Sequence, residues 1–236
     1  MIKHTLKRFD RELEILNDKV HSLFKVVRKN LGQGMEALQE GDVKLAEQVI
    51  EQDKAVNLLE VESDEQARNL IVHHQPAATD LRFVFAAIKI VADLERAGDF
   101  AKSIARETIA LNGSKLPKVK VDLDAMHEKV REQLKQVRLA YKERDSNLAL
   151  AVIDSDKEID AMHAANVKVL MDQMSKKPDA IQGCMAMLTV SRILERVGDH
   201  ATNVAEMVVY ITRGHEARHV DVRQLASMLQ GDDDEA

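Results

Sequence analysis

One six-residue phrase occurs twice in the chain and carries residue types that bind cations. Residues 94–99 read LERAGD and residues 194–199 read LERVGD. Each copy places a glutamate four residues before an aspartate, and on a helix such a pair lies on one face, about 6 Å apart, with a repulsion of a few tenths of a kcal/mol. The interior glycine costs roughly 1 kcal/mol relative to alanine. A bound cation would remove the repulsion, and the close approach of a ligand or a neighbouring helix would explain the glycine.

A second row of polar side chains precedes each copy at helical spacing. In the first half of the chain the row is Asp53, Asn57, Glu60 and Asp64, and in the second half it is Asp156, Asp160 and His163. Because consecutive antiparallel helices pack side by side, each row can face the carboxylate pair of the following helix. Oxygen ligands suit hard cations such as Mg, Mn or ferric iron, with Zn less favoured. Several adjacent carboxylates favour a multinuclear or highly charged ion.

Two interpretations without a bound metal remain. A single Glu-x-x-x-Asp pair is usually surface charge, and a helical scaffold without metal is one alternative. The duplication of the pair, each time with its glycine, favours metal binding. Arg96 and Arg196, inside the repeated phrase, are predicted to pair with nearby carboxylates, and an anionic ligand is the weaker alternative.

Two Asp-x-x-His elements suggest a different class of protein. Asp124 and His127, and again Asp160 and His163, lie in the sequence DAMH. They are similar to the Glu-x-x-His element of di-iron bundles, with aspartate in place of glutamate. A ferritin-like di-metal oxidoreductase or metal-storage bundle is therefore the alternative function, although Asp124 lies near a helix start, where a capping role is commoner.

The rest of the sequence gives no sign of an enzyme. It has no Gly-rich phosphate loop, no Gly-x-Ser-x-Gly and no His-Glu-x-x-His. Its one cysteine, Cys184, lies in an apolar stretch, which predicts an inert buried thiol in a reducing compartment.

Composition predicts an all-α protein. Aromatic residues make up 3% of the 236 residues, and glycine and proline are scarce. The net charge is −6 with both signs mixed, which argues against nucleic-acid binding. The longest apolar run, residues 83–94, contains Lys89 and Asp93 and falls short of the ~20 residues that cross a bilayer. We therefore expect a soluble cytoplasmic protein without direct membrane insertion, located at the inner membrane only through partners.

Apolar periodicity and turn residues divide the chain into six helices. The expected helices cover residues 5–39, 42–74, 79–111, 123–143, 146–174 and 180–213. Asp42 and either Thr79 or Asp80 are predicted to cap the second and third helices. The clearest linker is residues 112–117, and the turn before the last helix is residues 176–179.

The halves of the chain match beyond the repeated phrase. The pattern Asp-x-x-Leu-Ala-x-x-Val-Ile-x-x-Asp-Lys begins at Asp42 and again at Asp145. Such a duplication predicts two tandem three-helix bundles. The expected division is residues 1–116 for the first repeat, 117–214 for the second, and 215–236 for an acidic, disordered tail.

These motifs together resemble the PhoU family of bacterial regulators of phosphate transport and phosphate signalling. The resemblance rests on the two LERxGD copies, the sequence DKAVN at residues 53–57 with DKEID at 156–160, QPAATDLR at 75–82, and RHV at 218–220. It implies a non-catalytic negative regulator of phosphate uptake and of the phosphate-starvation response. The implied partners are the ATPase subunit of the phosphate importer, a phosphate-sensing histidine kinase, and a second copy of the chain in a homodimer.

The resemblance also implies metal centres, as multinuclear iron clusters or with other divalent ions. The candidate ligands, carried over to this sequence with Asn57 as a weaker member, are Asp53, Asn57, Glu95, Asp99, Asp156, Asp160, Glu195 and Asp199. Because Asn57 stands where the second repeat has Asp160, the two sites are expected to differ in affinity or nuclearity.

Overall fold

The computed structural model describes residues 7–111 and 116–214, and the described part contains α-helices, one 3-10 turn and no strand. The helices are α1 (Lys7–Glu40), α2 (Val43–His74), α3 (Ala78–Ala110), α4 (Leu123–Glu143), α5 (Ser146–Lys176) and α6 (Ile181–Arg213). The all-α prediction is therefore confirmed. The first four residues of the predicted linker (residues 112–115), the acidic tail and the RHV motif lie outside the described residues.

Most helix boundaries follow local chemistry that the sequence reveals. Asp42 caps α2 by accepting hydrogen bonds from the backbone N–H groups of Lys44 and Leu45, as predicted. Asp145 caps α5 in the same way. Gln75, just before Pro76, adopts a left-handed conformation and ends α2.

Two predicted boundaries were wrong. Neither Thr79 nor Asp80 caps α3, because the helix already begins at Ala78 and the cap position, Ala77, makes no side-chain hydrogen bond. Helical backbone resumes soon after Pro76, so Asp80 falls inside the first turn, where its charge complements the helix dipole. The other difference is that α5 extends to Lys176 and the following turn is a 3-10 turn, Pro178–Ala180.

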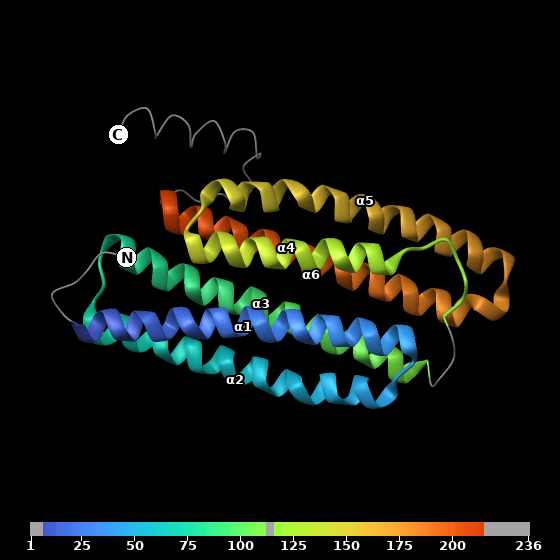
Figure 1. The fold of residues 1–236 in the computed structure, drawn as a ribbon, viewed down its shortest axis with the longest axis horizontal. Helices are drawn as coiled ribbons and strands as arrows, with labels where there is room; N and C mark the ends of the chain where they lie inside the picture. The colour runs from blue at the N-terminus through green and yellow to red at the C-terminus, as the bar shows by residue number, and fades with distance from the viewer. Residues whose placement is uncertain (1–6, 112–115, 215–236) are drawn as a thin grey trace.

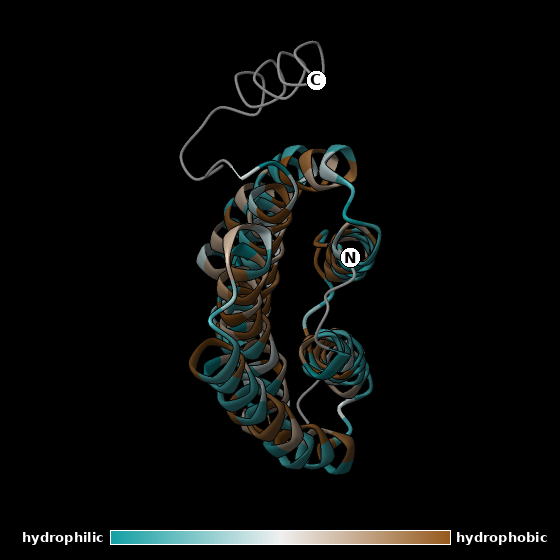
Figure 2. Cartoon of the chain, turned by 90° about the vertical axis from the view of Figure 1, so that its left-hand side faces the viewer, coloured by the Kyte–Doolittle hydropathy of each residue, from teal (hydrophilic) through white to brown (hydrophobic). Residues whose placement is uncertain are grey.

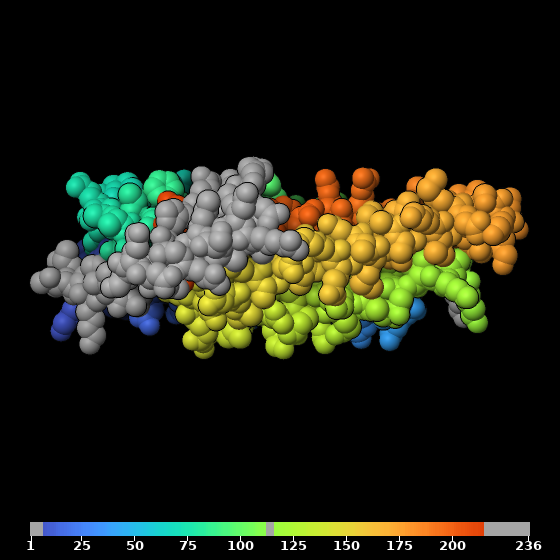
Figure 3. Space-filling view, turned by 90° about the horizontal axis from the view of Figure 1, so that it is seen from above, coloured from blue at the N-terminus to red at the C-terminus, as the bar shows by residue number. Residues whose placement is uncertain are grey.

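The helices form a curved row with two more helices on its inner side. Contacts place α2, α3, α6 and α5 side by side in that order, with α1 against α2 and α3, and α4 against α5 and α6. Figure 1 shows the two groups of three one above the other, and Figure 2 shows the row from its end with α1 and α4 on the concave side. Seen from above, the body is elongated, and α5 lies between α6 and α4 on the visible face (Figure 3). Two three-helix bundles thus meet along α3 and α6.

One apolar core runs through both bundles. The apolar face of α1 is buried, and Leu16, Val20, Leu23 and Val27 have no exposed surface. The core cluster continues through every helix from α1 to α6. Cys184 belongs to it, and burial raises the pKa of its thiol, as expected for an inert cysteine.

Candidate metal centre

Three aspartates of the second repeat converge between α5 and α6. Asp156 and Asp160 lie one turn apart on α5, Asp199 lies on α6, and one carboxylate oxygen of each lies within 4.8 Å of the others. Asp156 is half-buried, whereas Asp160 and Asp199 are exposed. We call these three residues the aspartate cluster.

Burial and mutual repulsion disfavour the ionised form of the carboxyl groups in the aspartate cluster. Burial raises the pKa of Asp156 to about 6, although the amide of Gln133 on α4 donates a hydrogen bond to its Oδ1 at 3.1 Å. Burial, followed by the nearby charge of Glu195, also raises the pKa of Asp199. A cation between these oxygens would remove the repulsion.

The glycine of the repeated phrase makes room for the deepest carboxylate. A Cβ atom added to Gly198 would lie 2.7 Å from Asp156 Oδ1 and 3.3 Å from Gln133 Oε1. That Oε1 atom is buried and accepts no hydrogen bond from the described residues. The glycine therefore serves the close approach of a neighbouring helix that carries the carboxylate, as predicted.

The matching place in the first repeat contains a lysine. Lys102 Nζ donates to Asp53 Oδ2 at 2.6 Å and lies 3.4 Å from Asp99 Oδ1. Only 3% of the Asp53 side chain is exposed, against 21% of Lys102. We call these three residues the lysine bridge. At the corresponding position of α6 the residue is Thr202, which carries no charge.

The remaining predicted ligands lie around these two groups. Glu95 is half-buried on α3, and burial, then the charge of Asp99, raises the pKa of its carboxyl group. Glu195 lies close enough to Asp199 to perturb its pKa but is outside the aspartate cluster. Asn57 is exposed on α2.

Among the predicted ligands, all of which lie in the described part of the chain, three carboxylates converge only in the aspartate cluster. Three converging carboxylates fit a hard divalent cation or ferric iron, which Asp156, Asp160 and Asp199 would bind, with Glu195 as a nearby further carboxylate. Within the described residues this is the one group of acidic, His or Cys side chains that converges so closely. In the lysine bridge an ammonium group already lies between the carboxylates, so that arrangement does not fit a metal.

Neither Asp-x-x-His element contributes its histidine to the aspartate cluster. Asp124 accepts a hydrogen bond from Gln39, and the cap of α4 is Asp122. His127 is buried, which lowers its pKa. His163 makes a 3.0 Å hydrogen-bond contact with Ser191 instead of joining the aspartate cluster.

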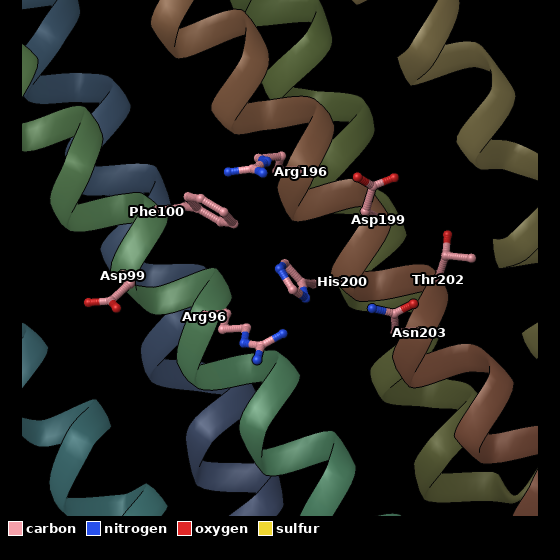
Figure 4. Close-up of a pocket in the computed structure, with 8 residues that line it drawn as sticks. All are labelled: Arg96, Asp99, Phe100, Arg196, Asp199, His200, Thr202 and Asn203. Atoms are coloured by element: carbon pink, nitrogen blue, oxygen red, sulfur yellow. The ribbon is translucent and has the colours of Figure 1, made fainter.

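A groove separates the aspartate cluster from the lysine bridge on the face away from α1 and α4 (Figure 4). Its volume is about 610 Å³, and the residues that line it are Arg96, Asp99, Phe100, Arg196, Asp199, His200, Thr202 and Asn203. Both guanidinium groups face the groove, whereas Asp99 and Asp199 point away from it. Arg196 lies over the ring of Phe100, 5.7 Å from its centroid.

The prediction for the two arginines was wrong. Within residues 7–111 and 116–214, neither Arg96 nor Arg196 forms an ion pair with a carboxylate. Asp99 and Asp199 point away from the groove into which both arginines project.

The floor of the groove joins the two repeats. His200 Nδ1 lies 2.8 Å from Asp93 Oδ1, and Asn203 donates to the same oxygen at 3.0 Å. Sequence reasoning missed this contact, and it also missed Lys102 and Gln133. An alignment of α3 with α6 would have singled out Lys102, because the corresponding residue of the second repeat, Thr202, carries no charge. The partners of Gln133 and Asp93 lie on helices distant in the sequence, and no local pattern marks them.

Two similar three-helix halves that share one apolar core define the class of duplicated helical-bundle proteins. The PhoU domain matches residues 20–108 and again residues 123–208, within the two predicted repeats. The chain therefore belongs to the PhoU family.

Relatives match over nearly their full length. The phosphate-specific transport system accessory protein PhoU homolog of Pseudomonas putida is 34% identical over 97% of this chain and 90% of its own. The accessory protein PhoU of Escherichia coli is 32% identical over 98% and 96%. The crystal structure of PhoU from Pseudomonas aeruginosa superposes with a TM-score of 0.84 at 34% identity, covering 88% of this chain and all of the other. The structure of the phosphate transport system regulatory protein PhoU from Streptococcus pneumoniae gives 0.80 at 26% identity, covering 90% and 99%.

None of the described helices is both long enough and apolar enough to span a membrane.

Proposed function

We propose that the chain is a metal-binding accessory protein of the phosphate transport system, which lowers phosphate uptake and represses the phosphate-starvation response when phosphate is plentiful. The observation that carries the regulatory part is the near full-length match to proteins named as accessory or regulatory proteins of phosphate transport. The geometry of the aspartate cluster supports the metal-binding part.

The aspartate cluster would hold the cation through residues of two helices. Asp156 and Asp160 belong to α5 and Asp199 to α6, so one ion would tie these helices together. The bound cation would supply positive charge that favours the ionised carboxylates. Gln133 orients Asp156 from α4 through its amide, as a positioning residue.

The chain acts as an adaptor in this proposal. It works in the cytoplasm as a homodimer and contacts the ATPase subunit of the importer and the phosphate-sensing histidine kinase. An elongated row of helices offers long exposed faces for such contacts (Figure 3), and the sequence has none of the catalytic motifs sought above. The di-metal oxidoreductase or storage alternative gains no support, since His127 and His163 do not converge with the aspartates.

Complementation of a strain that lacks the gene tests the regulatory role. The strain should show phosphate-starvation transcription at high phosphate, and the wild-type chain should restore repression. Unchanged transcription in the deletion strain would refute the regulatory role. Tagged protein from cells at high and low phosphate should capture the ATPase subunit and the kinase, and its native size should be that of a dimer.

Metal analysis of the same protein tests the centre. The wild-type chain should contain iron, Mn, Mg or Zn after purification without chelator. Asp160→Asn should lose that metal, whereas Asp172→Asn, an exposed aspartate of the same helix paired with Lys176, should retain it. Wild-type protein without metal, even after incubation with each ion, would contradict the metal-binding part alone.

A further inference from the structure

Besides Asn57 against Asp160, the repeats differ at a second position beside their carboxylates. Lys102 on α3 and Thr202 on α6 each lie three residues after the aspartate of the repeated phrase. The surrounding sequence is similar, since Glu95, Gly98 and Asp99 recur as Glu195, Gly198 and Asp199. The long cationic side chain of Lys102 and the short hydroxyl of Thr202 therefore give the two sites different charges, in addition to the difference between Asn57 and Asp160.

The lysine already does what a bound cation would do in the first repeat. Its Nζ contacts both Asp53 at 2.6 Å and Asp99 at 3.4 Å, and so bridges α2 and α3. Lys102 therefore places a positive charge between carboxylates of two different helices. Because Asp53 is almost completely buried, displacement of the lysine would leave a buried carboxylate without a compensating positive charge.

The second repeat has no such group. Thr202 leaves the space between α5 and α6 without a cation, and the three aspartates converge there within 4.8 Å. The nearest lysine in sequence, Lys157, pairs with Asp154 at 2.6 Å on the exposed side of α5. The positive charge is therefore supplied from within the chain in one repeat and must come from solution in the other.

We propose that this chain binds metal in its second repeat only, and that Lys102 is a built-in replacement for the metal of the first repeat. This inference rests on the proposed metal binding and replaces the expectation of two unequal centres. The cation position of the first repeat is then always occupied by the ammonium group of Lys102. Metal binding affects only the contact between α5 and α6.

Exchange of the two residues tests the inference on the full-length protein. Chelator-treated protein is titrated with Mn²⁺ and binding is measured by equilibrium dialysis and calorimetry. Wild type should show one binding phase, lost in Asp160→Asn and unchanged in Asp99→Asn. Thr202→Lys should weaken that phase at least tenfold. Thr202→Met, which is long but uncharged, should weaken it less, because the charge of the lysine rather than its bulk is what excludes the ion.

The reverse exchange should open the first repeat. Lys102→Thr should add a second binding phase that disappears when Asp99→Asn is combined with it, whereas Lys102→Arg should add none. Circular dichroism confirms that each variant is folded. If Lys102→Thr does not fold, Thr202→Lys still decides the question, with Thr202→Met as the control for loss of the buried Thr202 hydroxyl.

The outcomes separate this inference from the proposed function. Mn²⁺ binding by wild type that is lost in Asp99→Asn, or retained in full by Thr202→Lys, would overturn the inference and leave metal binding in place. No Mn²⁺, Zn²⁺ or Fe²⁺ binding by wild type would overturn both.

Discussion

The two glycines of the repeated phrase should respond differently to the same substitution. Alanine at Gly98 would place a Cβ 2.9 Å from Cγ1 of Val56, which is fully buried. Valine is stiff at χ1, and overpacking of a core costs about 1–3 kcal/mol. The gain in helix propensity is about 1 kcal/mol. The net expectation is a destabilisation of about 1 kcal/mol, and a fall in Tm of roughly 2–4 °C for a chain of this size.

Alanine at Gly198 should instead affect metal binding. There the added Cβ would lie 2.7 Å from the Asp156 carboxylate, which can rotate away at small cost. We expect the free energy of unfolding of the metal-free protein to change by less than about 1 kcal/mol, because the gain in propensity offsets the displacement. The affinity for Mn²⁺ should fall at least tenfold, about 1.4 kcal/mol, because Asp156 leaves the aspartate cluster.

Urea denaturation of metal-free protein and Mn²⁺ titration measure the two effects. Gly32→Ala is the matched control, since nothing lies within 4 Å of its added Cβ, and it should stabilise the chain by up to about 1 kcal/mol. Stabilisation by Gly98→Ala equal to that of Gly32→Ala, together with unchanged Mn²⁺ affinity in Gly198→Ala, would refute the packing argument at both positions.

Three further changes should alter stability, each measured by urea denaturation of metal-free protein. Lys102→Met leaves the buried Asp53 carboxylate without its partner and should cost about 3 kcal/mol. The pKa of Asp156 rises from 3.8 to about 6 on folding; the native state therefore binds more protons between these values, and stability should fall as pH rises through this window. Asp156→Asn should abolish that fall and stabilise the protein at pH 7 by about 2 kcal/mol, after discounting for partial exposure. Asp93→Ala removes the partner of His200 across the repeats and should cost about 1–3 kcal/mol.

Each of these expectations has a result that contradicts it. Lys102→Met with wild-type stability would mean that water replaces the ammonium group at Asp53. A pH profile that does not change in Asp156→Asn would place the titrating group elsewhere. Additive effects in a double-mutant cycle of Asp93→Ala and His200→Ala would show that the contact contributes no coupling energy.

Much of the fold could be predicted because local patterns determine it. The first two helices and the Asp42 cap depend on residues close together in the sequence, and their prediction was confirmed. The start of α3 was misplaced because Thr79 and Asp80 suit both a cap and a first turn, and the backbone after Pro76 decides between them.

The site was harder to predict because charge balance depends on contacts between helices. The pairing of Asp156 and Asp160 with Asp199 follows from periodicity and adjacent helices. The first repeat was predicted to hold an unequal metal site because of Asn57, and this prediction overlooked Lys102, whose ammonium group reaches Asp53 on another helix. The arginines were assigned to carboxylates by proximity in sequence, whereas the direction of each side chain sends them into the groove.

The apolar core that passes from one repeat to the other has a thermodynamic consequence. Since buried residues of α3 and α6 belong to the same cluster as those of the outer helices, neither half can lose its packing without exposing apolar surface of the other. The duplicated halves should therefore unfold in one cooperative transition. A free-energy change at one end of the chain, such as ion binding between α5 and α6, then protects amides of α1 and α2 from hydrogen exchange wherever that exchange requires global unfolding.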